Sequence, residues 1–158
     1  MAVTRDIVES WHRPRVVIRR LLDNGPSEPF AFALLVTFLI LAFTAAAPNL
    51  ARAAFLQPDT TLIQRLYAAG LGLLVTIPIW YLLAAIGHLV ARALGGTGSF
   101  YGGRLALFWA LVAVSPAMLV QGLIQGLLGV SPASVATGAV VATIFLIFWT
   151  VMLREVER

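Results

Sequence analysis

Four long apolar stretches constrain the fold of this chain more than any other feature of its sequence. They cover about residues 30–47, 66–90, 105–128 and 133–153, and the first contains no charged side chain. Each stretch has the roughly 17–25 residues that a helix needs to cross about 30 Å of hydrocarbon. Transmembrane β-strands alternate apolar and polar residues, and these stretches do not. The sequence therefore predicts an all-α integral membrane protein, a bundle of about four transmembrane helices.

The amino-acid composition supports the same fold class. Hydrophobic residues occupy 60% of the 158 positions and charged residues only 11%, and the mean hydropathy is +0.93. Soluble domains are typically about 45–50% apolar and about 25% charged. Because the chain has no cysteine, disulfides, thiolate catalysis and sulfur-ligated metals are excluded.

The apolar stretches divide the chain into three parts. Residues 1–29 form a charged N-terminal segment, residues 30–153 the transmembrane domain, and residues 154–158 a short tail. We interpret residues 30–47 as a retained span and not a cleaved signal peptide, because 29 residues precede the apolar core. Turn-forming residues are expected to separate the spans, at Pro48-Asn49, Gln57-Pro58-Asp59, Gly95-Gly96-Thr97-Gly98 and Gly129-Val130-Ser131-Pro132.

The distribution of arginine predicts the orientation of the spans. All eleven basic residues are arginine, and four spans would place nine of them on the side that holds both termini. The opposite side would hold only Arg52 and Arg65. Since positive charge near span ends stays in the cytoplasm, we expect both termini to be cytoplasmic.

The N-terminal segment is expected to form an amphipathic helix in the headgroup layer. Arginines lie opposite an apolar face that includes Trp11, and Pro14 should divide the segment into two short helices. Trp11, Arg15 and Arg19 are the candidate interfacial anchors. The segment serves either as a plain anchor for the first span or as a site that senses anionic lipids or docks a cytosolic partner.

Few residues inside the spans suggest transport. Pro78 and Pro116 should kink the second and third spans, as in transporters but also as in helices that only pack together. Between residues 30 and 154 the only carboxylate is Asp59, in a predicted loop. Carriers of protons and cations usually place a carboxylate inside the bundle. Ion-coupled transport is therefore disfavoured, whereas passage of a neutral solute stays open.

Polar and small residues of the third and fourth spans form a candidate interaction surface. Gln121 and Gln125 are one helical turn apart, and Gly122 and Gly126 form a GxxxG pattern. Gly138 continues the small-residue spacing on the fourth span. Small residues let helices approach closely, and amides can hydrogen-bond across the contact. We expect packing between these spans or between two subunits, with a polar permeation path as the alternative.

A second candidate site lies where the second span meets the third. His88 and Arg92 are four residues apart, and Arg104 opens the next span after a glycine-rich loop. The loop lacks the Gly-Lys-Ser/Thr ending of a phosphate-binding loop, so nucleotide binding is rejected. His88 has no second ligand for a metal. The three residues are expected either to contact lipid headgroups or a partner, or only to fix the depth of the helices.

Several short motifs give the chain a family resemblance. They are Ser10-Trp11-His12-Arg13-Pro14, His88-Leu89-Val90-Ala91-Arg92, the glycine-rich loop with Phe100-Tyr101, Phe108-Trp109 and Ser115-Pro116. With these motifs the chain resembles bacterial members of the Yip1-domain family, which implies a location in the bacterial inner membrane. Eukaryotic relatives are implicated in vesicle trafficking through Rab GTPases. That role is not expected of a compact chain without a long cytosolic domain, so the resemblance implies a fold and no activity.

Two functions follow from these observations. The first is a non-enzymatic scaffold, assembly factor or accessory subunit of a larger membrane complex, with membrane lipids and other subunits, or itself, as partners. The second is a small permease or channel for a neutral or anionic solute that uses Gln121, Gln125 and His88. An enzyme is disfavoured because no acid, base and nucleophile can be assembled within the spans. No cofactor and no nucleic acid is expected.

Overall fold

The structure is a computed structural model that describes residues 3–158 as seven helices. Two short helices, α1 (Val3–Ser10) and α2 (Pro14–Asp23), come first. The others are α3 (Glu28–Leu56), α4 (Leu62–Val75), α5 (Ile77–Ala93), α6 (Phe100–Leu128) and α7 (Pro132–Val156). Four segments are long and apolar enough to cross a membrane, namely α3, α4 together with α5, α6, and α7. The predicted bundle of about four transmembrane helices after a short N-terminal helix is confirmed.

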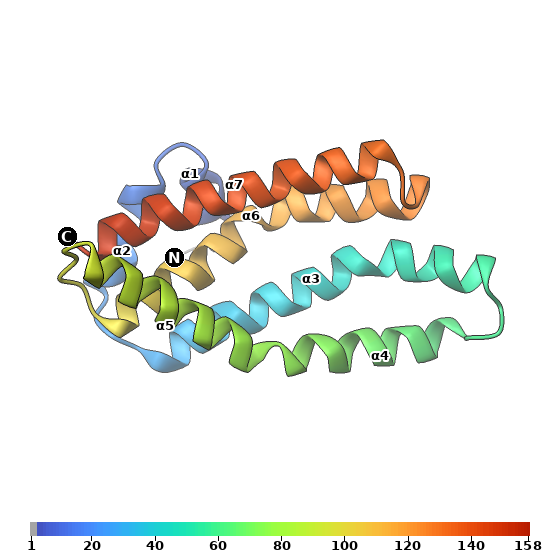
Figure 1. Cartoon of the computed structure of the whole chain (residues 1–158), viewed down its shortest axis with the longest axis horizontal. Coiled ribbons are helices and arrows are strands. Elements are labelled where there is room, and N and C mark those ends of the chain that lie inside the picture. The colour runs from blue at the N-terminus through green and yellow to red at the C-terminus, as the bar shows by residue number, and fades with distance from the viewer. Residues whose placement is uncertain (1–2) are drawn as a thin grey trace.

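The long helices run side by side along the longest axis of the molecule (Figure 1). The C-terminus, the α2–α3 connection and the α5–α6 loop lie at one end of the bundle, which we name the terminal end. The α3–α4 and α6–α7 turns lie at the opposite end, the distal end. The candidate residues His88, Arg92 and Arg104 therefore belong to the terminal end, whereas Gln121 and Gln125 belong to the distal half.

Helix α6 forms the centre of the bundle. Every residue from Leu105 to Ser115 is buried, beneath α3, α5, α7 and the two N-terminal helices. In its most apolar window 56% of the residues are buried, against 11% for α7 and 6% for α4 with α5. A helix that is hydrophobic on all sides suits this central position. The second and fourth spans consequently leave most of their apolar surface uncovered by the chain itself.

The second span is broken where Pro78 was expected to kink it. Helix α4 ends at Val75, and Pro78 lies in the first turn of α5, where its missing N–H costs no helical hydrogen bond. The Thr76 hydroxyl donates to the carbonyl of Leu73 (2.6 Å) and accepts the indole N–H of Trp80 (3.1 Å). These bonds pair the Thr76 hydroxyl and the Trp80 indole N–H in an apolar setting, where an unpaired polar group is costly.

The helices extend beyond the apolar runs of the sequence. We expected the first span to end at Ala47, but α3 continues through Pro48 to Leu56. Helix α4 starts four residues before residue 66, at Leu62, and α6 starts five before residue 105, at Phe100. An apolar run marks where hydrocarbon begins, whereas hydrogen bonding of the helix can continue into the headgroup layer. Pro48 removes only one of these hydrogen bonds.

The two N-terminal helices pack onto the bundle. Pro14 begins α2 and divides the segment into two short helices, as predicted. The apolar side of α2 is fully buried at Val17 and Ile18, and both helices contact α6, while α2 also contacts α7. The amphipathic pattern thus corresponds to a face that covers other helices of the same chain.

Candidate functional site

A buried contact between His88 and Glu157 joins separate segments of the chain at the terminal end. His88 Nδ1 lies 2.5 Å from Glu157 Oε1, and the side chains are 1% and 5% exposed. The N–H of Gly98 donates to Glu157 Oε2 (3.1 Å), and the N–H of Thr97 donates to the Glu157 carbonyl (2.8 Å). We name these four residues the C-terminal latch, because they tie the end of α7 to α5 and to the α5–α6 loop.

The glycine-rich loop is shaped to approach the Glu157 carboxylate. A Cβ on Gly96 would lie 2.7 Å from Glu157 Oε2, and a Cβ on Gly98 would lie 2.9 Å from the same atom. Side chains at either position would push the carboxylate away, since real Cβ contacts are longer. Gly95 adopts a φ of +96°, which glycine enters at little cost. The loop therefore holds a carboxylate of the chain itself.

The predicted basic cluster is divided among three environments. His88 faces inward, where its ring centroid lies 4.3 Å from that of Phe100. Arg104 forms an ion pair with Glu28 at the start of α3. Arg92 is exposed, and no ion pair joins it to any residue from 3 to 158. Of the three, only Arg92 presents an uncompensated charge to lipid headgroups or to a partner.

The side chain of Gln121 forms hydrogen bonds between α6 and α7. Its Nε2 donates to the carbonyl of Ser134 (2.9 Å), and its Oε1 accepts the hydroxyl of Thr137. Gly138 lies alongside, where a Cβ would be 3.3 Å from Gln121 Nε2. Gln125, one turn further along α6, is half-buried. The amide of Gln121 thus serves helix packing.

Gly122 and Gly126 form the closest helix contact of the bundle, and their neighbour is α3. A Cβ on Gly122 would lie 2.8 Å from the carbonyl carbon of Ala45, and one on Gly126 would lie 2.9 Å from that of Pro48. Small residues permit such close approach, and the pattern lies against the first span, whereas the sequence pointed to the fourth span or to a second subunit.

The predicted interfacial anchors contact the bundle to different degrees. The indole N–H of Trp11 donates to the carbonyl of Ala113 (3.0 Å), and its ring meets Phe148 edge to face. Arg19 forms an ion pair with the buried carboxylate of Glu155, whereas Arg15 is exposed. Trp11 and Arg19 therefore hold the N-terminal helices on α6 and α7.

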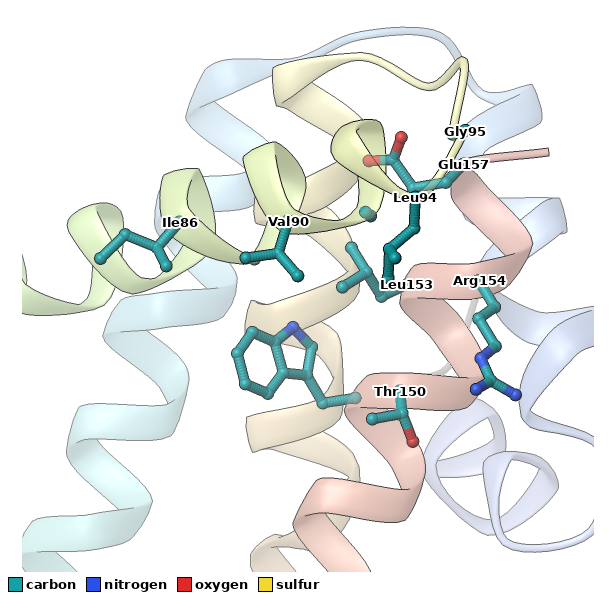
Figure 2. Close-up of a pocket in the computed structure, with 12 residues that line it drawn as sticks. Ile86, Val90, Leu94, Gly95, Thr150, Leu153, Arg154 and Glu157 are labelled. Atoms are coloured by element: carbon teal, nitrogen blue, oxygen red, sulfur yellow. The ribbon is translucent and has the colours of Figure 1, made fainter.

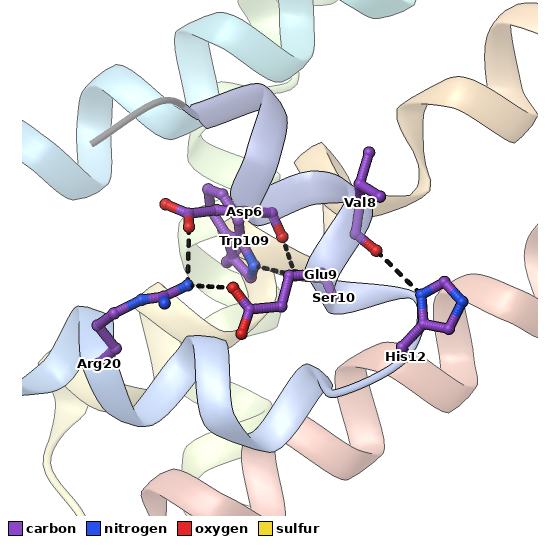
Figure 3. A network of polar contacts seen from close by, with 7 residues as sticks. All are labelled: Asp6, Val8, Glu9, Ser10, His12, Arg20 and Trp109. Carbon is purple, nitrogen blue, oxygen red and sulfur yellow. Dashed lines mark hydrogen bonds and ion pairs between the residues drawn. The ribbon is translucent and has the colours of Figure 1, made fainter.

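A polar network fastens α1 to α2 and to α6 (Figure 3). Arg20 donates to Asp6 Oδ1 (2.7 Å) and to Glu9 Oε2 (2.8 Å). The Ser10 hydroxyl accepts the indole N–H of Trp109 (2.9 Å) and donates to the Asp6 carbonyl (2.7 Å). The hydrogen bond from Arg20 lowers the pKa of Glu9, and the same bond raises the pKa of Arg20. Both shifts favour the charged pair.

A groove of about 620 Å³ lies between α5 and α7 at the terminal end (Figure 2). We name it the α5–α7 groove. Its lining is mostly apolar, with Glu157 at its terminal end and Arg154 on the rim formed by α7 (Figure 2). The apolar lining residues are Ile86, Gly87, Val90, Ala91, Leu94, Trp149 and Leu153.

Comparison with protein families decides the relationship of the chain. The model of the Yip1 domain matches residues 8–157, nearly the whole sequence. The chain belongs to the Yip1 domain family. No curated protein and no solved structure gives a significant match. The match begins near the end of α1 and ends at Glu157, so α2 and the C-terminal latch lie within this Yip1 domain.

Sequence reasoning missed three carboxylate partners of the candidate residues in the Yip1 domain, namely Glu157 for His88, Glu28 for Arg104 and Glu155 for Arg19. Glu157 lies 69 positions from His88 and outside the apolar runs, so no spacing linked the two. The only available signal was that Glu155 and Glu157 are the only carboxylates after Asp59. Within residues 3–158 of the Yip1 domain, no three His, Asp or Glu side chains gather as a metal site.

Proposed function

We propose that this Yip1 domain acts as a non-enzymatic scaffold, assembly factor or accessory subunit of a larger membrane complex. The observation that carries the proposal is the unequal burial of the spans. Among the described residues, none in α4 is buried, and α4 contacts chiefly α3. A helix that forms the distal half of a span but adds so little to its own bundle has most of its surface free for a transmembrane helix of another subunit.

The surface of α4 has the properties that helix association in lipid requires. Lipid tails are as apolar as leucine, so such association depends on close packing and not on hydrophobicity. Gly72 has no atom within 4 Å of the place its Cβ would take, so a neighbouring backbone could approach there. Val75, one turn further along α4, is 72% exposed, and Leu71, next to Gly72, is 63% exposed.

The hydrogen bonds that Gln121 forms with α7 argue against a permease. A channel for a polar solute needs hydrogen-bonding groups that are free to face the solute. Both ends of the Gln121 amide are bonded to α7 instead. We therefore favour the interaction role over transport.

The experiment that tests the proposal is photocrosslinking in the native membrane from a photoreactive amino acid at position 71. Leu71 is 63% exposed on α4, and Val140, 57% exposed on α7, provides a matched control. We expect one discrete adduct with another membrane protein, or with a second copy, from position 71 and none from position 140. Lipid adducts alone at both positions would contradict the proposal.

We further propose that both termini face the cytoplasm of a bacterial inner membrane. The support is the excess of arginine at the terminal end. Since the chain has no cysteine, Asp59→Cys and Arg158→Cys each create a single reporter thiol. A membrane-impermeant maleimide added to intact cells should label position 59 and spare position 158. The reverse pattern would refute this orientation.

A further inference from the structure

The α5–α7 groove has an apolar body and a single polar end. Ile86, Val90 and Leu153 line its body, and Ile86 and Leu94 lie eight residues, about 12 Å, apart along α5. The hydroxyl of Thr150 already donates to the carbonyls of Leu146 and Ile147, so it offers no free donor. The indole Nε1 of Trp149 has no hydrogen-bond partner among the described residues, but it is buried, so the accessible body of the groove suits a hydrocarbon chain.

The ring of Trp149 closes the groove where it meets α5. A Cβ on Gly87 would lie 2.7 Å from Trp149 Cζ2, so the indole lies directly on the glycine backbone. The resulting cavity of about 620 Å³ falls within the range of about 300–1,000 Å³ that is usual for sites of small ligands.

The α7 rim of the groove presents one uncompensated positive charge, that of Arg154, whose side chain runs back towards Thr150 (Figure 2). Arg154 is exposed, and no ion pair joins it to the described part of the chain. The carboxylate of Glu157 is 5% exposed and is held by His88 and Gly98, and that of Glu155 is held by Arg19. The carboxylates of Glu155 and Glu157 thus both have partners within the chain. The charge that a ligand would contact is that of Arg154.

We propose that the α5–α7 groove binds one phospholipid with an anionic headgroup. The acyl chain lies along Ile86, Val90 and Leu153, and the phosphate pairs with Arg154. The groove lies between transmembrane helices and opens at the headgroup end, so lipid can reach it laterally. Basic pockets between transmembrane helices are favoured sites for anionic headgroups. This site goes beyond the proposed accessory role and does not depend on it.

Native mass spectrometry of the purified full chain tests the site, with phosphatidylglycerol and phosphatidylcholine of identical acyl chains as probes. One arginine near the membrane surface is worth about a fivefold preference for the anionic lipid. We expect the chain to retain one phosphatidylglycerol with an apparent Kd about fivefold lower than for phosphatidylcholine. Equal affinity for the two lipids would overturn the proposal.

Two matched pairs of variants separate the effect of the Arg154 charge from the effect of the space in the α5–α7 groove. Arg154→Gln should abolish the preference, whereas Arg15→Gln, which removes an exposed arginine outside the groove, should retain it. Val90→Trp should fill the groove and remove both lipids, whereas Leu89→Trp should not, because position 89 is equally exposed but does not line the groove. Retention of lipid by Val90→Trp would refute the site. Loss of a homodimer in that variant, without loss of lipid, would assign the groove to a second copy.

Discussion

Gly122→Ala is expected to destabilise the bundle by about 3 kcal/mol, the upper part of the range for overpacking a core. The added Cβ would lie 2.8 Å from the carbonyl carbon of Ala45 and closer still to its oxygen. These are backbone atoms of α3, so no side chain can rotate away, and the two helices must separate. Because α3 and α6 share the largest helix contact of the chain, the loss should spread along their interface.

Gly72→Ala provides the control for that substitution. It makes the same chemical change in a transmembrane helix, but nothing lies within 4 Å of the new Cβ. Its unfolding free energy should stay unchanged or rise by up to about 1 kcal/mol, because alanine favours a helix. Denaturant titration of the purified proteins in micelles, followed by tryptophan fluorescence, measures both. Equal stabilities of the two variants would contradict the close contact of α3 with α6.

A second large effect is expected from breaking the C-terminal latch. Glu157→Met or His88→Phe alone leaves a buried polar partner without its contact, which typically costs about 1–3 kcal/mol. Replacing both partners by apolar groups of similar shape removes both side-chain polar groups together and leaves only the N–H of Gly98 without its acceptor. The double variant should therefore lose less than the sum of the single losses, by at least about 1 kcal/mol.

The same titrations complete a double-mutant cycle for the latch. Asp59→Asn, in the exposed α3–α4 loop, serves as a variant that removes a carboxylate outside any ion pair of the described residues. Its unfolding free energy should stay within about 0.5 kcal/mol of the wild type. Strict additivity of Glu157→Met and His88→Phe would show that the two side chains do not interact.

The spans could be predicted from the sequence because bilayer thickness and apolar length are directly related. The two short N-terminal helices were also predictable, since proline is favoured in the first turn of a helix and disfavoured in its interior. Helix ends were less predictable. Hydropathy changes at the edge of the hydrocarbon, whereas α3 remains hydrogen-bonded through Pro48 to Leu56.

The contacts of the candidate residues could not be predicted, because they depend on which helices become neighbours. Gly122 carries the same small-residue signal whether its partner is α3 or α7, and only the packing selects α3. Likewise, His88 and Arg92 share a helical spacing, but one turns towards Glu157 and the other stays exposed. Local patterns specify what a residue can contact, and tertiary structure specifies which contact it makes.

The accessory role is tested most directly by the size of the native assembly that contains position 71 of α4. The native membrane is extracted into polymer nanodiscs after photocrosslinking from that position, and the particles are separated by size before their chains are identified. We expect the crosslinked partner and the uncrosslinked chain to migrate together in one larger particle, at a fixed ratio. Migration of the chain as a lone monomer without any protein adduct at position 71 would contradict it.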